Sequence, residues 1–407
     1  MTDIASSTAA RERETRLAIR FLNWAHAIDH YVMLIFPTVV IGLEAVYGRP
    51  YAELIALGTA SFVAFGVFSL PAGWLADRWS RRNMMALFFV GCGLSLAGAA
   101  LAPNLIALAV ALFVLGIFAA IYHPVGMAML IEASQARGRT LAFNGVCGNL
   151  GAALAAGITA ALASVIGWRG AFFVPAALCV ATGIFYLMLT QDDRHHVGKR
   201  KTAPAVRLSQ GAMIAMFACF IVVALTAGLV FNMISVSLPK IVDERLSDAS
   251  LMMVGGIATA VFMCGALAQL SVGRLSEKFT PHGLFAIIVA MQLAGIYWAA
   301  HATGISLILA LAVSMAAIYG QVTVNDMVIA RYTADAWRGR VYAVRYFLIF
   351  VTSGVGVALI ALLYRQGGFD LVLMVNAFVS FVLLIAVIGI VGIITAASPK
   401  ASAQPAE

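Results

Sequence analysis

The segment Gly73-Trp74-Leu75-Ala76-Asp77-Arg78-Trp79-Ser80-Arg81-Arg82 separates two long apolar runs. About 200 residues later a shorter version, Gly273-Arg274-Leu275-Ser276-Glu277-Lys278, stands between two other apolar runs. A compact charged loop that returns at half the chain length is typical of a duplicated membrane protein.

The composition agrees with this interpretation. Charged residues make up 11% and apolar residues 62% of the 407 positions, whereas soluble domains carry about 25% charged residues. Apolar runs of about 20 residues recur along the chain, each long enough to cross a hydrocarbon core of about 30 Å as a helix. Most of the chain therefore cannot face water, and helices are the structure that spans lipid.

The apolar runs predict an all-α membrane protein with twelve transmembrane helices in two pseudo-symmetric six-helix bundles. We expect five parts: a cytoplasmic tail at 1–19, a first bundle at 20–190, a cytoplasmic linker at 191–210, a second bundle at 211–395 and a cytoplasmic tail at 396–407. A second repeated segment supports the duplication, since Ala136-Arg137-Gly138-Arg139 returns as Trp337-Arg338-Gly339-Arg340.

The basic residues predict the orientation. Most Lys and Arg residues fall in loops on the same side as both tails and the linker, which favours the cytoplasm for that side. We therefore expect a multi-pass protein of a bacterial inner membrane, surrounded by lipid and functional as a monomer. The net charge of +8 is scattered over short loops, so no nucleic-acid partner is expected. The polar stretch 1–20 predicts no cleaved signal peptide.

The segment at 73–82 resembles the loop between the second and third helices of the major facilitator superfamily, G-x-L-A-D-R-x-G-R-K/R, with Ser80 in place of a glycine. The resemblance implies a cytoplasmic gate in which Asp77 contacts the start of span eleven, where Arg338 and Arg340 lie. It also implies an ion pair between Arg78 and Glu132. The remaining residues assigned to the gate are Gly73 and Arg82 in the first half and Gly273, Glu277 and Lys278 in the second. The alternative is that these charges only follow the positive-inside bias.

The first span contains the polar residues Asn23, His26, Asp29 and His30. A charge at membrane depth costs about 2.5 to 3.5 kcal/mol on insertion scales, so these residues should line a wet cavity between the halves. His26 to His30 lie about 9 to 15 Å in from Arg20, and His123 lies about 13 Å in from Glu132. The matching depths predict one group that exchanges protons. A static hydrogen-bonded core and a metal site are the alternatives, and no metal or cofactor is assigned.

The string Tyr122-His123-Pro124, with a histidine ahead of an acidic residue in span one, is similar to the fosmidomycin-resistance branch of efflux proteins. That family has Asn-Asp about where this chain has Asp29-His30, so the acid is displaced by one residue. The resemblance implies efflux.

The second half contributes Asn325, Asp326 and Arg345. An ion pair between Asp326 and Arg345 would neutralise both charges, as a gate or as a static link. If the substrate is an anion, Arg345 is its best counter-charge.

The leading hypothesis is a secondary transporter, not an enzyme, that exports a small organic solute by alternating access and exchanges protons. The alternative is proton-coupled uptake of a metabolite such as an organic acid. A non-transporting membrane sensor and a metal-ion transporter are weaker alternatives. ATP-driven pumping is disfavoured because the chain lacks a G-x-x-x-x-G-K-S/T string.

Overall fold

The computed structural model describes residues 2–133, 137–190, 209–246, 248–333 and 335–397, and these residues contain helices and no strand. The elements are α1 (Thr2–Tyr47), α2 (Tyr51–Ala56), α3 (Thr59–Arg78), α4 (Arg81–Leu101), α5 (Leu105–Ala119), the π-helix η1 (Tyr122–Gly126), α6 (Met127–Ala133), α7 (Arg137–Leu189), α8 (Gln210–Arg245), α9 (Leu251–Leu275), α10 (Pro281–His301), α11 (Gly304–Tyr332) and α12 (Asp335–Ala397). The predicted all-α membrane fold is confirmed.

Ten helical stretches in the described residues are long and apolar enough to cross a membrane. Two of them are interrupted by glycine. Helix α7 turns at Gly167, with φ of 79°, and α12 turns at Gly367 and Gly368, where Gly368 has φ of 59°. Positive φ costs glycine little because it has no Cβ. Counting each of these two helices as a pair of segments is consistent with the twelve predicted spans.

The duplication is visible in the helix boundaries. Helix α4 begins at Arg81 and α10 begins at Pro281, and the turns at Gly167 and Gly367 are likewise separated by about 200 residues. The repeated loop at Asp77 therefore belongs to a repeat of a whole bundle.

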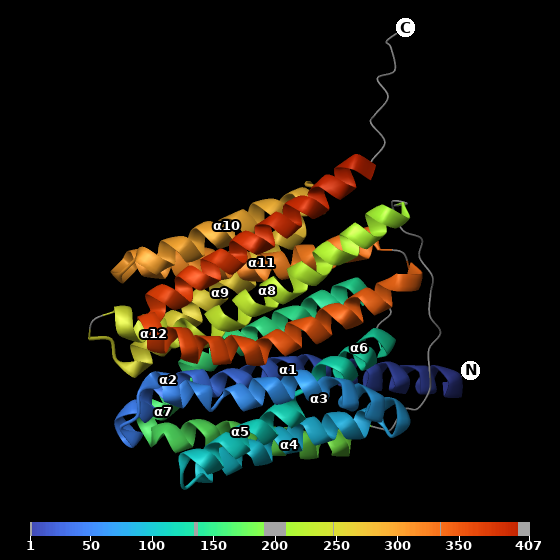
Figure 1. The fold of residues 1–407 in the computed structure, drawn as a ribbon. Helices are drawn as coiled ribbons and strands as arrows, with labels where there is room; N and C mark the ends of the chain where they lie inside the picture. Colours follow the sequence, from blue (N-terminus) through green and yellow to red (C-terminus); the bar gives the residue numbers. More distant parts are fainter. Residues whose placement is uncertain (1, 134–136, 191–208, 247, 334, 398–407) are drawn as a thin grey trace.

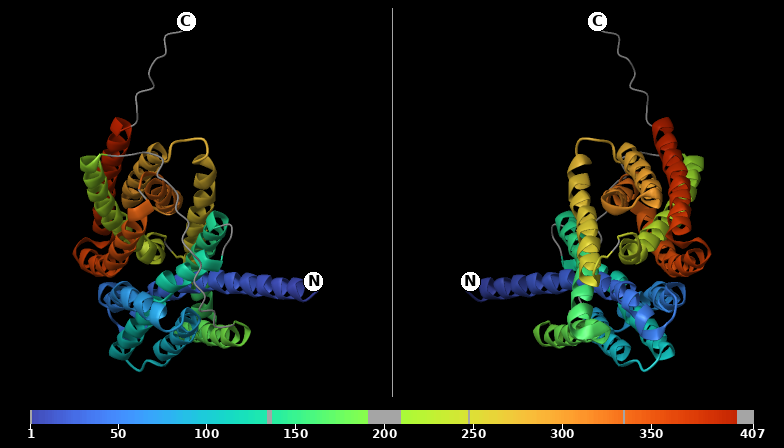
Figure 2. Two further views of the ribbon diagram at one scale, coloured as in Figure 1. Left: turned by 90° about the vertical axis from the view of Figure 1, so that its right-hand side faces the viewer. Right: turned by 90° about the vertical axis from the view of Figure 1, so that its left-hand side faces the viewer.

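Figure 1 shows the two bundles one above the other, α1 to α7 below and α8 to α12 above. The start of α1 and the end of α12 lie at the right of this view, and we call that side the terminus end. The turns of α7 and α12 lie at the opposite end. Figure 2 shows the bundles one above the other along the helix axes. Between the bundles, α1 contacts α8, α3 contacts α12 and α7 contacts α9.

Small residues let the helices approach closely. A Cβ on Gly66 of α3 would lie 2.6 Å from the backbone oxygen of Phe350 in α12, and one on Gly255 of α9 would lie 2.7 Å from that of Ala156 in α7. The outer faces carry large exposed apolar side chains, among them Leu70, Ile106, Val165, Met188 and Ile305. Such a surface is suited to lipid, which solvates apolar groups well.

The two segments predicted to flank the first bundle differ in how much of them the structure describes. The tail predicted at 1–19 continues α1 as helix from Thr2. Most of the linker predicted at 191–210 lies outside the described residues.

Candidate functional site

Helix α1 brings two of the predicted histidines together. His26 and His30 are one turn apart on the same face, and their Nε2 atoms are 3.2 Å apart. His26 Nδ1 lies 2.8 Å from the backbone oxygen of Asn144. Because a carbonyl oxygen only accepts, Nδ1 of His26 donates and its Nε2 keeps the lone pair. The Nε2–H of His30 therefore donates to Nε2 of His26.

The π-helix η1 positions the third histidine. Pro124 has no N–H and cannot continue an α-helical hydrogen-bond ladder, and the wider turn of η1 accommodates it. The preceding residue, His123, places its Nε2 3.3 Å from Oδ2 of Asp29. Asp29 is 1% exposed, so its carboxylate depends on this partner for charge compensation.

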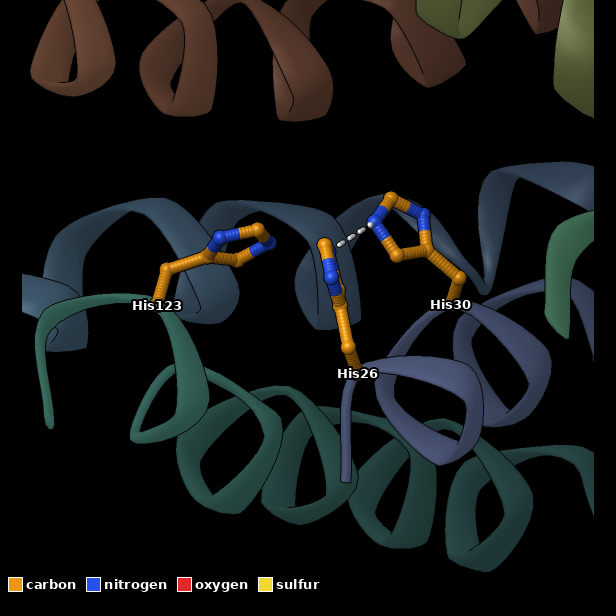
Figure 3. A group of neighbouring side chains, drawn as sticks. All are labelled: His26, His30 and His123. Carbon is orange, nitrogen blue, oxygen red and sulfur yellow. Dashed lines mark hydrogen bonds between the residues drawn. The ribbon is translucent and has the colours of Figure 1, made fainter. Parts of the chain in front are cut away.

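The imidazole ring of His123 lies 5.4 Å from that of His26 and 5.8 Å from that of His30, measured between ring centroids. Figure 3 shows the three rings turned toward one another from α1 and η1. We call His26, Asp29, His30 and His123 the histidine cluster. Phe350 of α12 packs on His123 at 5.2 Å, so the cluster faces the second bundle.

Neighbouring residues fix the position of His26. The ring of Tyr122 stacks on it at 4.8 Å, and the Tyr122 hydroxyl donates to Oδ1 of Asn144 at 3.0 Å. Nδ2 of Asn144 donates in turn to Oδ1 of Asn23 at 3.0 Å. A Cβ on Gly148 of α7 would lie 2.6 Å from Nε2 of His26, so the imidazole occupies space that only glycine leaves free.

An open, mostly apolar cavity of about 480 Å³ lies on the terminus side of the cluster, where α1 and α7 meet α9 of the second bundle. It is lined by Ile19, Asn23, Thr140, Ala142, Phe143, Val146 and Leu270. Leu270 belongs to α9 in the second bundle, whereas the other residues belong to α1 and α7. Asn23 lines this cavity and is linked through Asn144 to His26, so the cavity reaches the polar network of the cluster.

In the second bundle, Arg345 of α12 forms an ion pair with Asp326 of α11. The Arg345 side chain is 5% exposed, while that of Asp326 is 42% exposed. Asn325 is buried beside Asp326, and its Oδ1 has no hydrogen-bond partner. The predicted pair is thus present inside one bundle and links two of its helices.

The gate at the terminus end differs from the prediction. Arg81, not Arg78, binds Glu132, and Arg81 also lies 2.8 Å from Asp77. Arg78 ends α3 one turn after Trp74 and stacks on that exposed ring at 4.0 Å, which turns it away from Glu132. Arg81 begins α4 after the turn at Trp79 and Ser80, where it reaches both acids.

The other residues assigned to the gate have varied surroundings. Arg82 donates to the backbone oxygens of Thr190 at 2.7 Å and Leu187 at 2.5 Å, where a cation favours the carboxyl end of α7. A Cβ on Gly73 would lie 3.3 Å from Cβ of Pro124, so α3 packs closely on η1. In the second half, Glu277 and Lys278 are exposed and Gly273 has open space beside it. The side chains of Arg338 and Arg340, the predicted partners of Asp77, lie outside the described residues.

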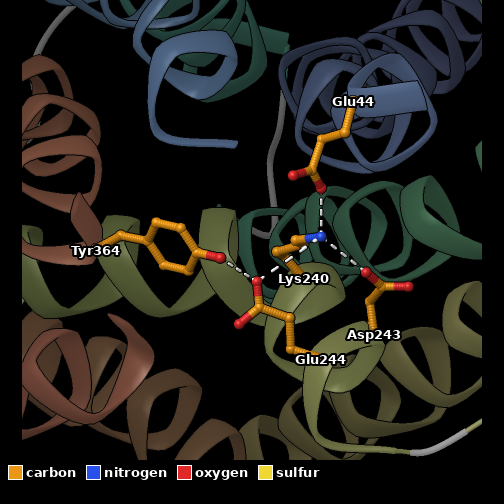
Figure 4. Close-up of polar contacts among 5 residues, drawn as sticks. All are labelled: Glu44, Lys240, Asp243, Glu244 and Tyr364. Carbon is orange, nitrogen blue, oxygen red and sulfur yellow. Dashed lines mark hydrogen bonds and ion pairs between the residues drawn. The ribbon is translucent and has the colours of Figure 1, made fainter. Parts of the chain in front are cut away.

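The opposite end holds an ionic network that the sequence analysis did not identify. Nζ of Lys240 in α8 binds the carboxylate of Glu44 in α1 and lies 3.0 Å from Asp243 and 3.8 Å from Glu244. Tyr364 of α12 donates to Glu244, and Figure 4 shows all five side chains around the Lys240 amine. We call these five residues the outer network. Within the outer network, the contact between Glu44 and Lys240 is the ion pair that joins the two bundles.

A sequence signal for this network exists. Lys240 ends an apolar run and is followed by acids three and four positions later, which places three charges on one helix face. Glu44 ends the first span in the same way. Their pairing across the bundles, however, depends on how α1 and α8 meet.

Comparisons with known proteins agree with the geometry. The chain is 29% identical over 150 residues to the "Probable L-galactonate transporter" of Escherichia coli (strain K12), covering 36% of this chain and 33% of the relative. It is 30% identical over 167 residues to a puromycin resistance protein of Streptomyces alboniger, covering 40% of this chain and 33% of the relative. The chain spans about a third of the length of these curated relatives.

Two solved structures share the fold. A bacterial homologue of the human lysosomal transporter Spinster, in an inward-facing and occupied conformation, superposes with a TM-score of 0.76 at 14% identity, covering 95% of this chain and 99% of that one. A D-xylose-proton symporter superposes with a TM-score of 0.74 at 14% identity, covering 91% and 96%. Efflux and the fosmidomycin-resistance branch stay predictions. Residues 22–320 match the Major Facilitator Superfamily, and together with the two-bundle fold this match shows that the chain belongs to that superfamily.

Proposed function

We propose that this protein is a secondary active transporter, not an enzyme, that exports a small organic solute by alternating access in exchange for protons. The observation that carries the proposal is the pair between Asp29 and His123, a buried acid 3.3 Å from an imidazole at the surface between the bundles. Its polar network continues through His26 and Asn144 to Asn23, which lines the open cavity of about 480 Å³.

Alternating access requires that one end of the cavity is closed while the other is open. Here Glu44 and Lys240 join the bundles at the opposite end, whereas the cavity lies toward the terminus end. The likeness to a Spinster homologue solved in an inward-facing conformation supports the same state for this chain. We infer that the terminus end faces the cytoplasm of a bacterium, because most Lys and Arg residues lie there.

Proton coupling follows from the chemistry of the cluster. A deprotonated Asp29 attracts a protonated His123, and a proton bound to Asp29 removes that attraction. Because the two side chains belong to α1 and η1, protonation changes the contact between two elements that line the interface. The solved D-xylose-proton symporter with the same fold supports proton coupling as a use of this architecture.

Uptake of an organic acid is the second candidate function. Arg345 favours uptake of an anion because it is a buried cation. Its ion pair with Asp326 neutralises it in this conformation, however, which reduces its attraction for an anionic substrate. The relatives include both a resistance protein and a transporter named for a sugar acid. Efflux of a neutral or cationic solute therefore fits the charges better.

The test is transport in proteoliposomes, with a panel of labelled solutes and an imposed pH gradient of either sign. The sign of the gradient that drives accumulation distinguishes efflux from uptake. Asp29→Asn should abolish gradient-driven accumulation while solute exchange continues, because exchange needs no net proton movement. Glu53→Gln is the matched control, since Glu53 is an exposed acid that pairs only with Arg49 on the surface. Full gradient-driven accumulation by Asp29→Asn would reject Asp29 as the coupling residue.

A further inference from the structure

Two of the three histidines of the cluster, His26 and His30, have ring nitrogens at the spacing of metal ligands, and a nitrogen of the third lies near them. Two imidazole nitrogens bound to one Zn²⁺ at about 2.05 Å in tetrahedral geometry lie about 3.3 Å apart. The Nε2 atoms of His26 and His30 lie 3.2 Å apart. One ring nitrogen of each of the three histidines falls within 4.8 Å of the others. Histidines four residues apart on one helix face are also the arrangement by which helices present two ligands to one metal ion.

The surroundings orient these nitrogens. Nδ1 of His26 is held by the backbone oxygen of Asn144 at 2.8 Å, so its Nε2 lone pair points into the cluster. Ligating histidines generally donate their second N–H to such a carbonyl, which sets the tautomer and the ring plane. Tyr122 stacks on the same ring at 4.8 Å. His26 is therefore preorganised as a neutral ligand, and a metal ion would take the place of the hydrogen bond that His30 now donates.

The charge at this place suits a cation. Asp29 is buried, and its Oδ2 lies 3.3 Å from Nε2 of His123. A carboxylate next to a ligating histidine offsets part of the charge of a divalent ion and raises the basicity of the ligand. Asp29 contributes a negative charge to a group whose other members are neutral as ligands. Asn23, one turn before His26, lines the open cavity on the terminus side of the cluster.

We propose that His26, His30 and His123 form a binding site for a divalent transition-metal ion such as Zn²⁺, with Asp29 as the compensating charge. Imidazole ligands favour Zn²⁺, Ni²⁺ and Cu²⁺ over Mg²⁺ and Ca²⁺, which require oxygen ligands. A bound ion links α1 to η1 and competes with the proton for the same cluster. The site stands independently of the proposed function, because its ligands and its test do not depend on transport.

The binding experiment uses the full chain in detergent, purified through a tag without histidine. The parent protein carries His195→Ala and His196→Ala, because these two histidines lie in the predicted linker and could bind metal by themselves. Isothermal titration with Zn²⁺ should give one site per chain, and Mg²⁺ should give none. X-ray absorption spectra of the Zn²⁺-loaded parent should show about three imidazole ligands. Scattering without imidazole would overturn the proposal, whatever the behaviour of the variants.

Three variants connect the site to its residues. His30→Ala and His123→Gln should each weaken Zn²⁺ binding on the order of 100-fold, and Asp29→Asn about tenfold, while each variant still elutes as a single species in size-exclusion chromatography. His301→Ala is the matched control, since His301 is an exposed histidine at the end of α10, and it should bind Zn²⁺ like the parent. Unchanged affinity in folded His30→Ala and His123→Gln would disprove the site. Loss of gradient-driven accumulation in Asp29→Asn supports the proposed function, and Zn²⁺ binding by the parent supports the metal site, so the two proposals are tested separately.

Discussion

At the scale of single residues, His26 shows how a buried polar side chain is held. Its Nδ1 donates to Asn144, its ring stacks on Tyr122 and its Nε2 accepts from His30. Each contact comes from a different part of the chain, so the position of this imidazole depends on packing between helices. The clearest dependence is on Gly148, whose missing side chain makes room for the ring.

Gly148→Ala should therefore destabilise the protein by about 1 to 3 kcal/mol, because the new methyl group overlaps Nε2 of His26, to which a Cβ would be 2.6 Å. The measurement is the midpoint of thermal unfolding in detergent, followed by tryptophan fluorescence. Gly145→Ala on the same helix is the control, since a Cβ there has its nearest neighbour at 4.0 Å. Equal midpoints for the two variants would contradict the packing argument.

At the scale of elements, η1 is the least regular part of the described spans and also the part that carries His123. Pro124 accounts for the irregularity, because it cannot donate the hydrogen bond that an α-helix requires at its position. The π-helix ends at Gly126 and α6 follows directly. The irregular turn therefore sets the angle about the helix axis between the side chains of His123 and Glu132. An apolar run that ends in a charge suggests one straight helix, and the position of Pro124 is the only sequence signal against it.

Pro124→Ala should restore a regular turn and rotate His123 away from Asp29. We expect turnover in the proteoliposome assay to fall on the order of tenfold, because the pair at 3.3 Å would be lost. Pro71→Ala is the matched control, since Pro71 also lies inside a helix but on an exposed position of α3. Unchanged turnover in Pro124→Ala would show that the π-helix is not needed for the pair.

At the scale of the whole molecule, the bundles meet where α1 contacts α8, α2 and α3 contact α12, and α7 contacts α9. Among the described ion pairs they are joined by charge at one end only. The side chain of Lys240 is 9% exposed and its amine faces three carboxylates, so the outer network retains negative charge when the lysine is protonated. Breaking the contact between Glu44 and Lys240 should favour the conformation in which the end that holds the outer network is open and the terminus end is closed.

Glu44→Gln should shift this equilibrium by about 1 to 2 kcal/mol, since Lys240 keeps Asp243 as a partner. The readout is a cysteine at Val146, which lines the cavity, in a chain whose native cysteines are replaced. Its reaction with a bulky thiol reagent from the terminus end should slow on the order of tenfold. Glu53→Gln serves again as the control, because its ion pair with Arg49 does not join the bundles. An unchanged rate in Glu44→Gln would argue against the outer network as a lock.

The sequence by itself determined the membrane class, the duplicated helical fold and the residue types of the site. Composition, the length of apolar runs and the spacing of repeats can all be counted along the chain without knowing which helices meet. It also predicted the pair of Asp326 with Arg345, since neighbouring spans have matching depths. Only the tertiary structure decided that Arg81 rather than Arg78 reaches Glu132, that Lys240 meets Glu44, and that three histidines point at one another. Which side chains meet depends on helix rotation and on the packing of glycines such as Gly148, and spacing along a single chain does not contain that information.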